Sequence, residues 1–277
     1  MSKMKLNGIL SETRRKTPLV QVITNYVTIN DCANVLLACG ASPAMCEVEQ
    51  EAYAFSKLSA AVYCNIGTLT PEQRLAIKEA LRGAAEKEIP VILDPVGCGA
   101  IPSRIDYIEE LRSQYPIHVV KGNLGEIKSL AGIKTEVRGV DSVDDGKDAV
   151  EACVSLARDW QCVVAATGEQ DVVTDGTRVA VIQNGTQMLT KITGAGCMAG
   201  AVIAGFCGAA ASSFEGTVAG LLAISLAGEQ AAASADGDLP GTFKVKLIDE
   251  IHRLTEEIMT ASGKVKWITP SQTDSIQ

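Results

Sequence analysis

A glycine-led segment in the second half of the chain has the residue types best suited to chemistry. Residues 191–200 read Lys-Ile-Thr-Gly-Ala-Gly-Cys-Met-Ala-Gly, and an Ala/Gly-rich apolar run follows without a further charge. We interpret that run as a buried helix, whose first turn leaves backbone N–H groups unpaired at the positive end of the helix dipole. Because Gly194, Ala195 and Gly196 have almost no side chains, an anion can reach these donors. The segment predicts a site for a phosphate or a developing oxyanion, with Cys197 at its mouth.

Two other interpretations fit the same letters. Gly194, Gly196 and Ala199 match a loose dinucleotide-binding pattern, which should follow a strand and precede an acidic residue at the end of the next strand. Glu215 has a suitable spacing, but the Ala-Ala-Ala-Ser-Ser-Phe before it does not read as a buried strand. The other interpretation is a glycine-rich helix start that serves only close packing. The segment alone leaves anion binding and close packing open.

Small and polar residues also follow the short β-rich runs of the chain. In open α/β sheets, ligands bind beyond the carboxyl ends of the strands, so these residues are expected to gather at one edge. Each could be a turn residue or a helix cap. The residues that follow the strands are Asn25, Gly67, Asp94, Lys121, Asn123, Glu126, Thr167, Gly168 and Glu169. Five of them suit a metal nucleotide, because carboxylates bind Mg²⁺ and a lysine binds phosphate; these five are Asp94, Lys121, Asn123, Glu126 and Thr167.

Strand-like and helix-like segments alternate through most of the chain, which predicts a mostly parallel sheet covered on both faces. Thr70 and Pro71 are a typical N-cap and first residue of a helix. From about residue 194 the pattern is almost wholly helical. We expect one domain over 1–277 with a loose polar tail after about 267. The expected strands cover 19–24, 61–65, 91–93, 117–120, 163–166, 171–174 and 178–182, and the expected helices cover 28–39, 71–88, 104–114 and 146–159.

Composition excludes several classes of partner. The 277 residues carry a net charge of −8 and are 47% hydrophobic but only 4% aromatic, which argues against nucleic acid or an anionic membrane as partner. The uncharged run 192–214 is long enough to span a bilayer, but its many Gly and Ala residues favour a packed soluble helix. The nine cysteines form no C-x-x-C pair, and the N-terminus lacks a signal-peptide core. We expect free thiols in the cytoplasm.

Several motifs, in order, resemble the ribokinase-like small-molecule kinases. They are Asp-Pro-Val at 94–96, Asn-x-x-Glu at 123–126 and Thr-Gly-Ala-Gly at 193–196. The sequence is more closely similar to the hydroxyethylthiazole kinase family, over roughly residues 8 to 265. The stretches that carry this closer resemblance are 23–28, 31–38, 40–45, 65–69, 94–100 and 240–243.

The resemblance implies a fold and a reaction. The fold is a ribokinase-like three-layer α/β/α sandwich with a mostly parallel central sheet and no separate lid domain. The reaction is ATP-dependent phosphorylation of the primary hydroxyl of 4-methyl-5-(2-hydroxyethyl)thiazole, in thiamine biosynthesis or salvage. Hydroxymethylpyrimidine or another small heterocyclic alcohol is the alternative acceptor. The family forms trimers with the substrate pocket between subunits, so Asn25 and Met45 are candidates for a neighbour's active site.

Residue by residue, the resemblance also implies roles. The backbone amides of Gly194, Ala195, Gly196 and Cys197 cradle the transferring phosphoryl group, and Asp94 and Glu126 organise Mg²⁺. The expected ATP contacts are Lys121, Asn123, Thr167 and Gly168. The expected contacts to the thiazole alcohol are Met45, Gly194, Asn25, Val27 and Gly67.

Cys197 departs from the wider pattern, in which an Asp commonly follows Gly-Ala-Gly and accepts the alcohol proton. An unperturbed thiol is only a few per cent thiolate at neutral pH. The helix start favours the thiolate, whereas nearby phosphates oppose it. The sequence therefore leaves two roles open, a general base or a group that orients the hydroxyl.

Two functions outside the kinases compete. A cysteine-nucleophile enzyme built on Cys197 needs a partner base, but the only histidines, His118 and His252, lie in no recognisable partner motif. A non-catalytic scaffold of the same fold should have lost Asp94, Glu126 or the glycine-rich turn, and the sequence retains all three.

Overall fold

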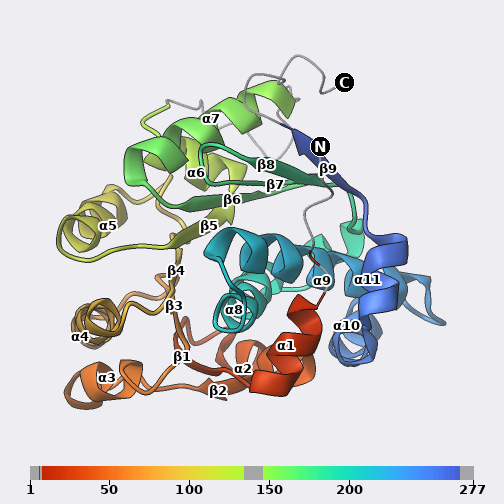
Figure 1. Cartoon of the computed structure of the whole chain (residues 1–277), viewed down its shortest axis with the longest axis horizontal. Helices are drawn as coiled ribbons and strands as arrows, with labels where there is room; N and C mark the ends of the chain where they lie inside the picture. The colour runs from red at the N-terminus through yellow and green to blue at the C-terminus, as the bar shows by residue number, and fades with distance from the viewer. Residues whose placement is uncertain (1–5, 7, 134–145, 269–277) are drawn as a thin grey trace.

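The computed structural model describes Leu6, residues 8–133 and residues 146–268 (Figure 1). The strands of this described part form one nine-stranded sheet in the order β2-β1-β3-β4-β5-β6-β7-β8-β9. Neighbouring strands pair in parallel from β2 to β6, and β7, β8 and β9 are antiparallel additions. The strands are β1 (Leu19–Ile23), β2 (Ser42–Ala44), β3 (Ala61–Asn65), β4 (Val91–Asp94), β5 (Val119–Asn123), β6 (Val163–Thr167), β7 (Asp171–Thr174), β8 (Val179–Ile182) and β9 (Val265–Ile268).

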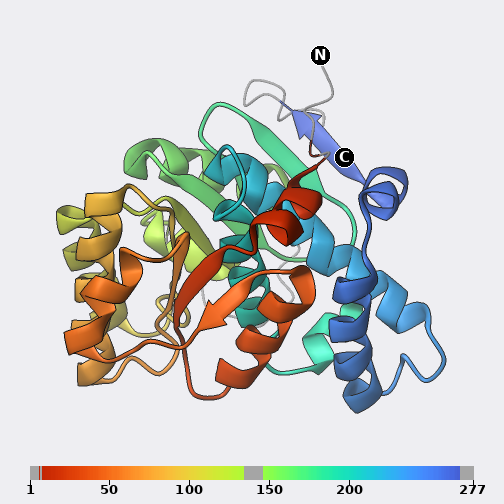
Figure 2. The same ribbon diagram turned by 60° about the horizontal axis from the view of Figure 1, so that its bottom comes forward.

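Helices cover both faces of the sheet, as Figures 1 and 2 show. Each face has its own hydrophobic core. One face is covered by α1 (Ile9–Lys16), α2 (Ile29–Cys39), α8 (Ala195–Cys207), α9 (Ser213–Ala233), α10 (Pro240–Arg253) and α11 (Glu256–Ser262). The other is covered by α3 (Glu49–Ser56), α4 (Pro71–Lys87), α5 (Pro102–Gln114), α6 (Leu124–Leu130) and α7 (Gly146–Trp160). The predicted three-layer sandwich with a mostly parallel sheet is confirmed.

Alternation along the central strands decides which side chains face α8. In β3, Ala61 and Tyr63 pack into the core on the α8 face, whereas Val62 and Cys64 pack into the opposite core. The same period of two places Ile92 and Val119 on the α8 face. The next positions in phase are Asn65, Asp94 and Lys121, which therefore lie on the α8 face at the carboxyl ends of their strands.

Small residues let α8 pack closely against the sheet and against α9. A Cβ added to Gly200 would lie 2.6 Å from the ring of Tyr63, and one added to Gly220 would lie 2.9 Å from the Cα of Ile203. Close packing is therefore the correct interpretation for the later part of the Ala/Gly-rich run. That run is not one helix, because α8 ends at Cys207 and α9 begins at Ser213. Among the described residues, no helix is long and apolar enough to cross a membrane.

Most predicted elements are present. The helices α1, α3 and α6 were not predicted, and three strands need correction. β2 was not predicted, because the short Ser-Pro-Ala segment is only half-buried and lacks β-branched residues. The expectation of an almost wholly helical chain after 194 is wrong at β9, whose four residues pair with β8. The strand expected at 117–120 instead covers Val119–Asn123 and includes polar residues that a search for apolar runs passes over. The predicted cap at Thr70 is confirmed. The loose tail was expected after about residue 267, and from residue 269 onward it lies outside the described residues.

Candidate active site

The carboxyl ends of four neighbouring strands bring the predicted polar residues to one edge of the sheet. Asn65 at the end of β3 pairs in register with Asp94 at the end of β4. Asn123 at the end of β5 pairs with Thr167 at the end of β6. The first turn of α8 lies against this edge, because Lys121 Nζ on β5 donates to the carbonyl oxygen of Gly196 at 2.9 Å.

Asp94 is the centre of a buried hydrogen-bond cluster and is only 1% exposed. Its Oδ2 accepts from Tyr63 Oη at 2.9 Å, Asn65 Nδ2 at 3.1 Å and Lys121 Nζ at 3.2 Å. Its Oδ1 has no hydrogen-bond partner among the described residues. Leaving a buried carboxylate oxygen unpaired is costly, so Oδ1 marks a place where a ligand is expected.

Lys121 lies beneath the glycine-led turn and is 3% exposed. Burial is the largest single influence on the pKa of its ammonium group and would lower it, but Asp94 and the other acidic groups nearby together outweigh burial, and the pKa is raised. The ammonium therefore stays charged and gives the floor of the site a fixed positive charge. The described geometry directs it to Asp94 and Gly196, and its predicted contact with ATP phosphates stays a prediction.

The start of α8 has the features that anion binding requires. Gly194 is the N-cap residue with φ +85°, and no side chain caps the helix. A Cβ at Gly194 would lie 2.5 Å from Thr28 Cγ2, so only glycine fits there without displacement. The first intrahelical bond runs from Met198 N to Gly194 O at 2.8 Å. The amides of residues 195–197 therefore precede the helical ladder and are available to an anion.

The dinucleotide-binding interpretation of this segment is wrong. A short 3₁₀ helix, η1 (Gln187–Lys191), precedes Gly194 where that motif requires a strand. Glu215 lies in the first turn of α9, where its amide is capped by Ser212 Oγ at 3.3 Å. Glu215 therefore does not end a strand.

Cys197 is half-buried at the opening of the cluster. Its Sγ accepts from Asn25 Nδ2 and Asn65 Nδ2, each at 3.3 Å. Its carbonyl oxygen accepts from Tyr63 Oη at 3.0 Å. Asn25 therefore lies at the cysteine of its own chain.

Glu126 and Asn123 form a reciprocal capping box at the start of α6. Glu126 Oε2 accepts from Asn123 N at 2.9 Å, and Oε1 accepts from Gly97 N at 2.8 Å in the loop after β4. Burial raises the pKa of Glu126, and these backbone donors act in the opposite direction. The carboxylate thus fixes the loop beside Asp94. Among the described residues, no group of three His, Cys, Asp or Glu side chains could hold a metal ion by itself.

The remaining predicted residues lie around this cluster. Thr167 Oγ1 donates to Gly122 O at 3.2 Å, and the amide of the exposed Gly168 donates to Asp171 Oδ1 at 3.1 Å. Gly67 N donates to Asn65 Oδ1 at 2.9 Å.

Two predicted substrate contacts are less directly placed. Met45 is half-buried against the core on the α8 face, as Cys197 is. Val27 is 65% exposed, and none of the contacts described above joins it to the cluster.

Comparison with known proteins identifies the family. The model of the hydroxyethylthiazole kinase family matches residues 10–257. The chain belongs to this family. It is 57% identical to the hydroxyethylthiazole kinase of Desulfitobacterium hafniense, over 96% of this chain and 100% of that protein, and 52% identical to that of Clostridium novyi, over 93% and 96%. The solved structure of the hydroxyethylthiazole kinase protein from Pyrococcus horikoshii matches with a TM-score of 0.86 at 35% identity, covering 95% of this chain and 98% of that one. The predicted ribokinase-like architecture is confirmed.

Two members of the hydrogen-bond cluster around Asp94 were not identified from the sequence. They are Tyr63 and Asn65. Both lie in β3, whose residues are all buried. A signal for Asn65 was available in the sequence. It is a polar residue at the end of a buried strand, two positions after a tyrosine, and therefore on the same face of the sheet. It was missed because we read only the residues beyond each strand, and Asn65 is the last residue within it.

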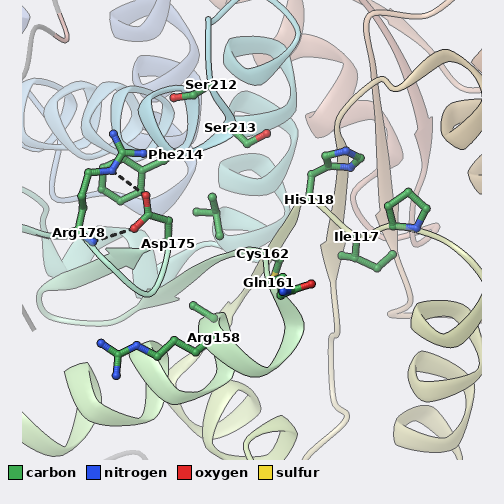
Figure 3. Close-up of a pocket in the computed structure, with 13 residues that line it drawn as sticks. Ile117, His118, Arg158, Gln161, Cys162, Asp175, Arg178, Ser212, Ser213 and Phe214 are labelled. Carbon is green, nitrogen blue, oxygen red and sulfur yellow. Dashed lines mark hydrogen bonds and ion pairs between the residues drawn. The ribbon is translucent and has the colours of Figure 1, made fainter.

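The cavity drawn in Figure 3 lies away from the cluster around Asp94. A cavity of about 620 Å³ is lined by Ile117, His118, Cys162, Asp175 and Phe214, among others. These residues precede β5 and β6, follow β7 or begin α9, so the cavity lies at the amino ends of the parallel strands. It shares no residue with the cluster around Asp94.

Proposed function

We propose that this chain transfers the γ-phosphoryl group of ATP to the primary hydroxyl of 4-methyl-5-(2-hydroxyethyl)thiazole, releasing ADP and the thiazole phosphate. The observation that carries the proposal is membership of the hydroxyethylthiazole kinase family over residues 10–257. The uncapped start of α8 above a buried, partly unpaired carboxylate supports it. Membership of this family also favours the thiazole alcohol over hydroxymethylpyrimidine.

In this proposal the amides of residues 195–197 hold the oxygens of the transferring phosphoryl group. Phosphoryl transfer needs in-line positioning and neutralisation of oxygen charge more than covalent chemistry. Fixed backbone donors meet that need, because they need not reorganise as charge moves toward the leaving oxygen. The buried Lys121 ammonium adds positive charge from below the turn.

Asp94 and Glu126 are the residues that would hold Mg²⁺. The donor set fits, because Mg²⁺ prefers carboxylate oxygens and water, and Asp94 Oδ1 is buried without a partner. The ion would neutralise charge on the ATP phosphates. The hydrogen bonds from Gly97 and Asn123 hold the Glu126 carboxylate in place for this role.

Cys197 is proposed to receive or orient the alcohol hydroxyl. Its sulfur lies at the opening of the cluster and one residue beyond Gly196, so a hydroxyl placed against it lies beside the proposed phosphoryl site. The proposed ATP contacts are Lys121, Asn123, Thr167 and Gly168. The proposed thiazole contacts are Met45, Gly194, Asn25, Val27 and Gly67.

We also propose a cytoplasmic homotrimer, formed by one domain over 1–277, with active sites between subunits. All nine cysteines are free, which suits a reducing compartment. Tyr26 and Val27, beside Asn25, are 56% and 65% exposed, which suits burial against another subunit. Light scattering after size-exclusion chromatography tests the trimer, and a monomer at micromolar concentration would contradict it.

ADP release tests the reaction. The assay uses Mg-ATP with a panel of thiazole, pyrimidine and sugar alcohols, and a reaction without alcohol measures background ATP hydrolysis. The thiazole alcohol should give the highest kcat/KM. A higher value for hydroxymethylpyrimidine, or release that does not depend on any alcohol, would contradict the proposal.

A further inference from the structure

We propose that Asn65 is a positioning residue, which joins Asp94 to Cys197 and holds the Cys197 sulfur as a hydrogen-bond acceptor at the alcohol site. This inference rests on the proposed kinase function. Its basis is the amide of Asn65, which lies between the two groups and bonds to both.

Backbone geometry fixes which way the Asn65 amide points. A side-chain amide can be turned by half a rotation without changing its shape, so its orientation follows from its partners. Gly67 N is a donor only, and it lies 2.9 Å from Asn65 Oδ1. The amide oxygen must therefore face Gly67, and Nδ2 must face Asp94 and Cys197.

The orientation of Asn25 follows from that of Asn65. Asn25 Nδ2 donates to Asn65 Oδ1 at 3.0 Å, so this nitrogen too is on the side of Cys197. Two amide groups thus direct N–H donors at the same sulfur, each at 3.3 Å. Among the described residues, none accepts a hydrogen bond from Cys197 Sγ. The sulfur of this half-buried side chain is therefore held as a hydrogen-bond acceptor.

Asn65 also connects this sulfur to the proposed phosphoryl site. Its Nδ2 shares two hydrogens among Asp94 Oδ2, Tyr63 Oη and Cys197 Sγ, at 3.1, 3.1 and 3.3 Å. Asn65 is buried and pairs with Asp94 in the sheet, so it cannot turn freely. One rigid amide therefore sets the relative position of the carboxylate and the sulfur.

The first test measures the sulfur without any substrate. Leucine has a volume similar to that of asparagine but no hydrogen-bond donor. Asn65→Leu should therefore slow alkylation of Cys197 by iodoacetamide at pH 7.5 about tenfold, since donors to sulfur favour the thiolate. Mass spectrometry of the Cys197 peptide separates it from Cys46, the other half-buried cysteine. Asn184→Leu is the matched control, because Asn184 is also a buried, hydrogen-bonded asparagine but bonds Glu229 and Ser262. It should leave alkylation unchanged.

The second test is a double-mutant cycle on kcat with the thiazole alcohol. Asn65→Leu should lower kcat about tenfold in the natural sequence but less than twofold in a Cys197→Ala background, with little change in the KM for ATP. An equal loss in both backgrounds would mean that Asn65 acts through Asp94 or through the fold and not through Cys197, and it would overturn the proposal. Unchanged alkylation of Cys197 would overturn it as well.

Two further outcomes keep the proposals separate. If Asn65→Leu does not fold, Asn65→Ser retains one donor and should give an intermediate alkylation rate, and a rate equal to that of the natural chain overturns the proposal. If alkylation slows as expected but no alcohol is phosphorylated by the natural chain, the proposed kinase function fails while the positioning of the sulfur is upheld.

Discussion

The two edges of the central sheet differ in how their polar groups are satisfied. At the carboxyl edge, Asp94 Oδ1 is buried without a partner and the amides at the start of α8 have no side-chain cap. At the amino edge, around the cavity of Figure 3, several polar groups have partners within the chain. Asp175 accepts from Arg178 Nε at 2.7 Å, Arg158 Nε donates to Gly176 O at 2.9 Å, and Ser212 Oγ caps α9.

The comparison shows that volume alone does not locate function in this molecule. The cavity at the amino edge is large, but Asp175 and Arg178 bind each other and Arg158 binds a backbone carbonyl oxygen. His118 there accepts from Val91 N at 3.1 Å, and burial lowers the pKa of its ring, which favours the neutral form. The carboxyl edge instead holds uncapped donors at the start of α8 and an unpaired acceptor at Asp94. Unsatisfied buried polarity is the better guide to the site.

The largest effect is expected when one carboxylate is neutralised at each edge of the sheet and the two variants are compared. Asp94→Asn should lower kcat about a thousandfold, because it removes the negative charge proposed to hold Mg²⁺ and leaves the buried Lys121 ammonium without its partner. Asp175→Asn at the amino edge should change kcat less than twofold. Both are measured by ADP release with the thiazole alcohol, with circular dichroism to confirm folding. Equal losses would remove the distinction between the edges.

A smaller effect is expected from closing the anion site with one methyl group. Gly194→Ala places a Cβ against Thr28 at a residue with φ +85°, so kcat should fall about a hundredfold and the melting temperature should drop. Gly241→Ala in the first turn of α10 is the control, because a Cβ there meets nothing within 4 Å. Full activity of Gly194→Ala would contradict a tight phosphoryl site at this turn.

Changes at Cys197 should be milder and should depend on the residue introduced. Cys197→Ala should lower kcat on the order of tenfold and leave ATP affinity, measured by calorimetry, nearly unchanged. Cys197→Asp should retain or raise turnover, because a carboxylate can accept the alcohol proton. Loss of nucleotide binding in the alanine variant would show that the sulfur serves the nucleotide and not the alcohol.

The smallest effect on turnover concerns a second buried carboxylate at the same edge, Asp171. Burial raises the pKa of Asp171 from 3.8 to about 6, so the folded chain binds this proton more tightly than the unfolded chain does. The free energy of unfolding should therefore fall by about 3 kcal/mol as pH rises from about 4 to about 6, and this contribution should be constant above that pH.

Asp171→Asn should remove this decline and should be at least as stable as the natural chain at pH 7, with nearly unchanged kcat. Urea unfolding at several pH values measures it, and the exposed Asp159→Asn is the control that should retain the natural pH dependence. An unchanged decline in Asp171→Asn would contradict the assignment to this carboxylate.

Much of the fold and half of the site follow from local sequence. Long amphipathic helices and apolar strands are specified by periodicity, and Asp94 and Thr167 are recognisable because they directly end apolar runs. β2 and β9 were missed because most of their residues are only half-buried, so neither strand has the continuous apolar run that marks the buried strands. The pairing of Asn65 with Asp94 is a property of sheet register, which no single segment encodes.

The central claim is that the phosphates of ATP bind at the start of α8, above Asp94. A crystal structure with Mg²⁺ and a non-hydrolysable ATP analogue tests it most directly. We expect the terminal phosphate oxygens within hydrogen-bond distance of the amides of residues 195–197. Terminal phosphates in the cavity at the amino edge, or anywhere else away from that turn, would contradict the claim.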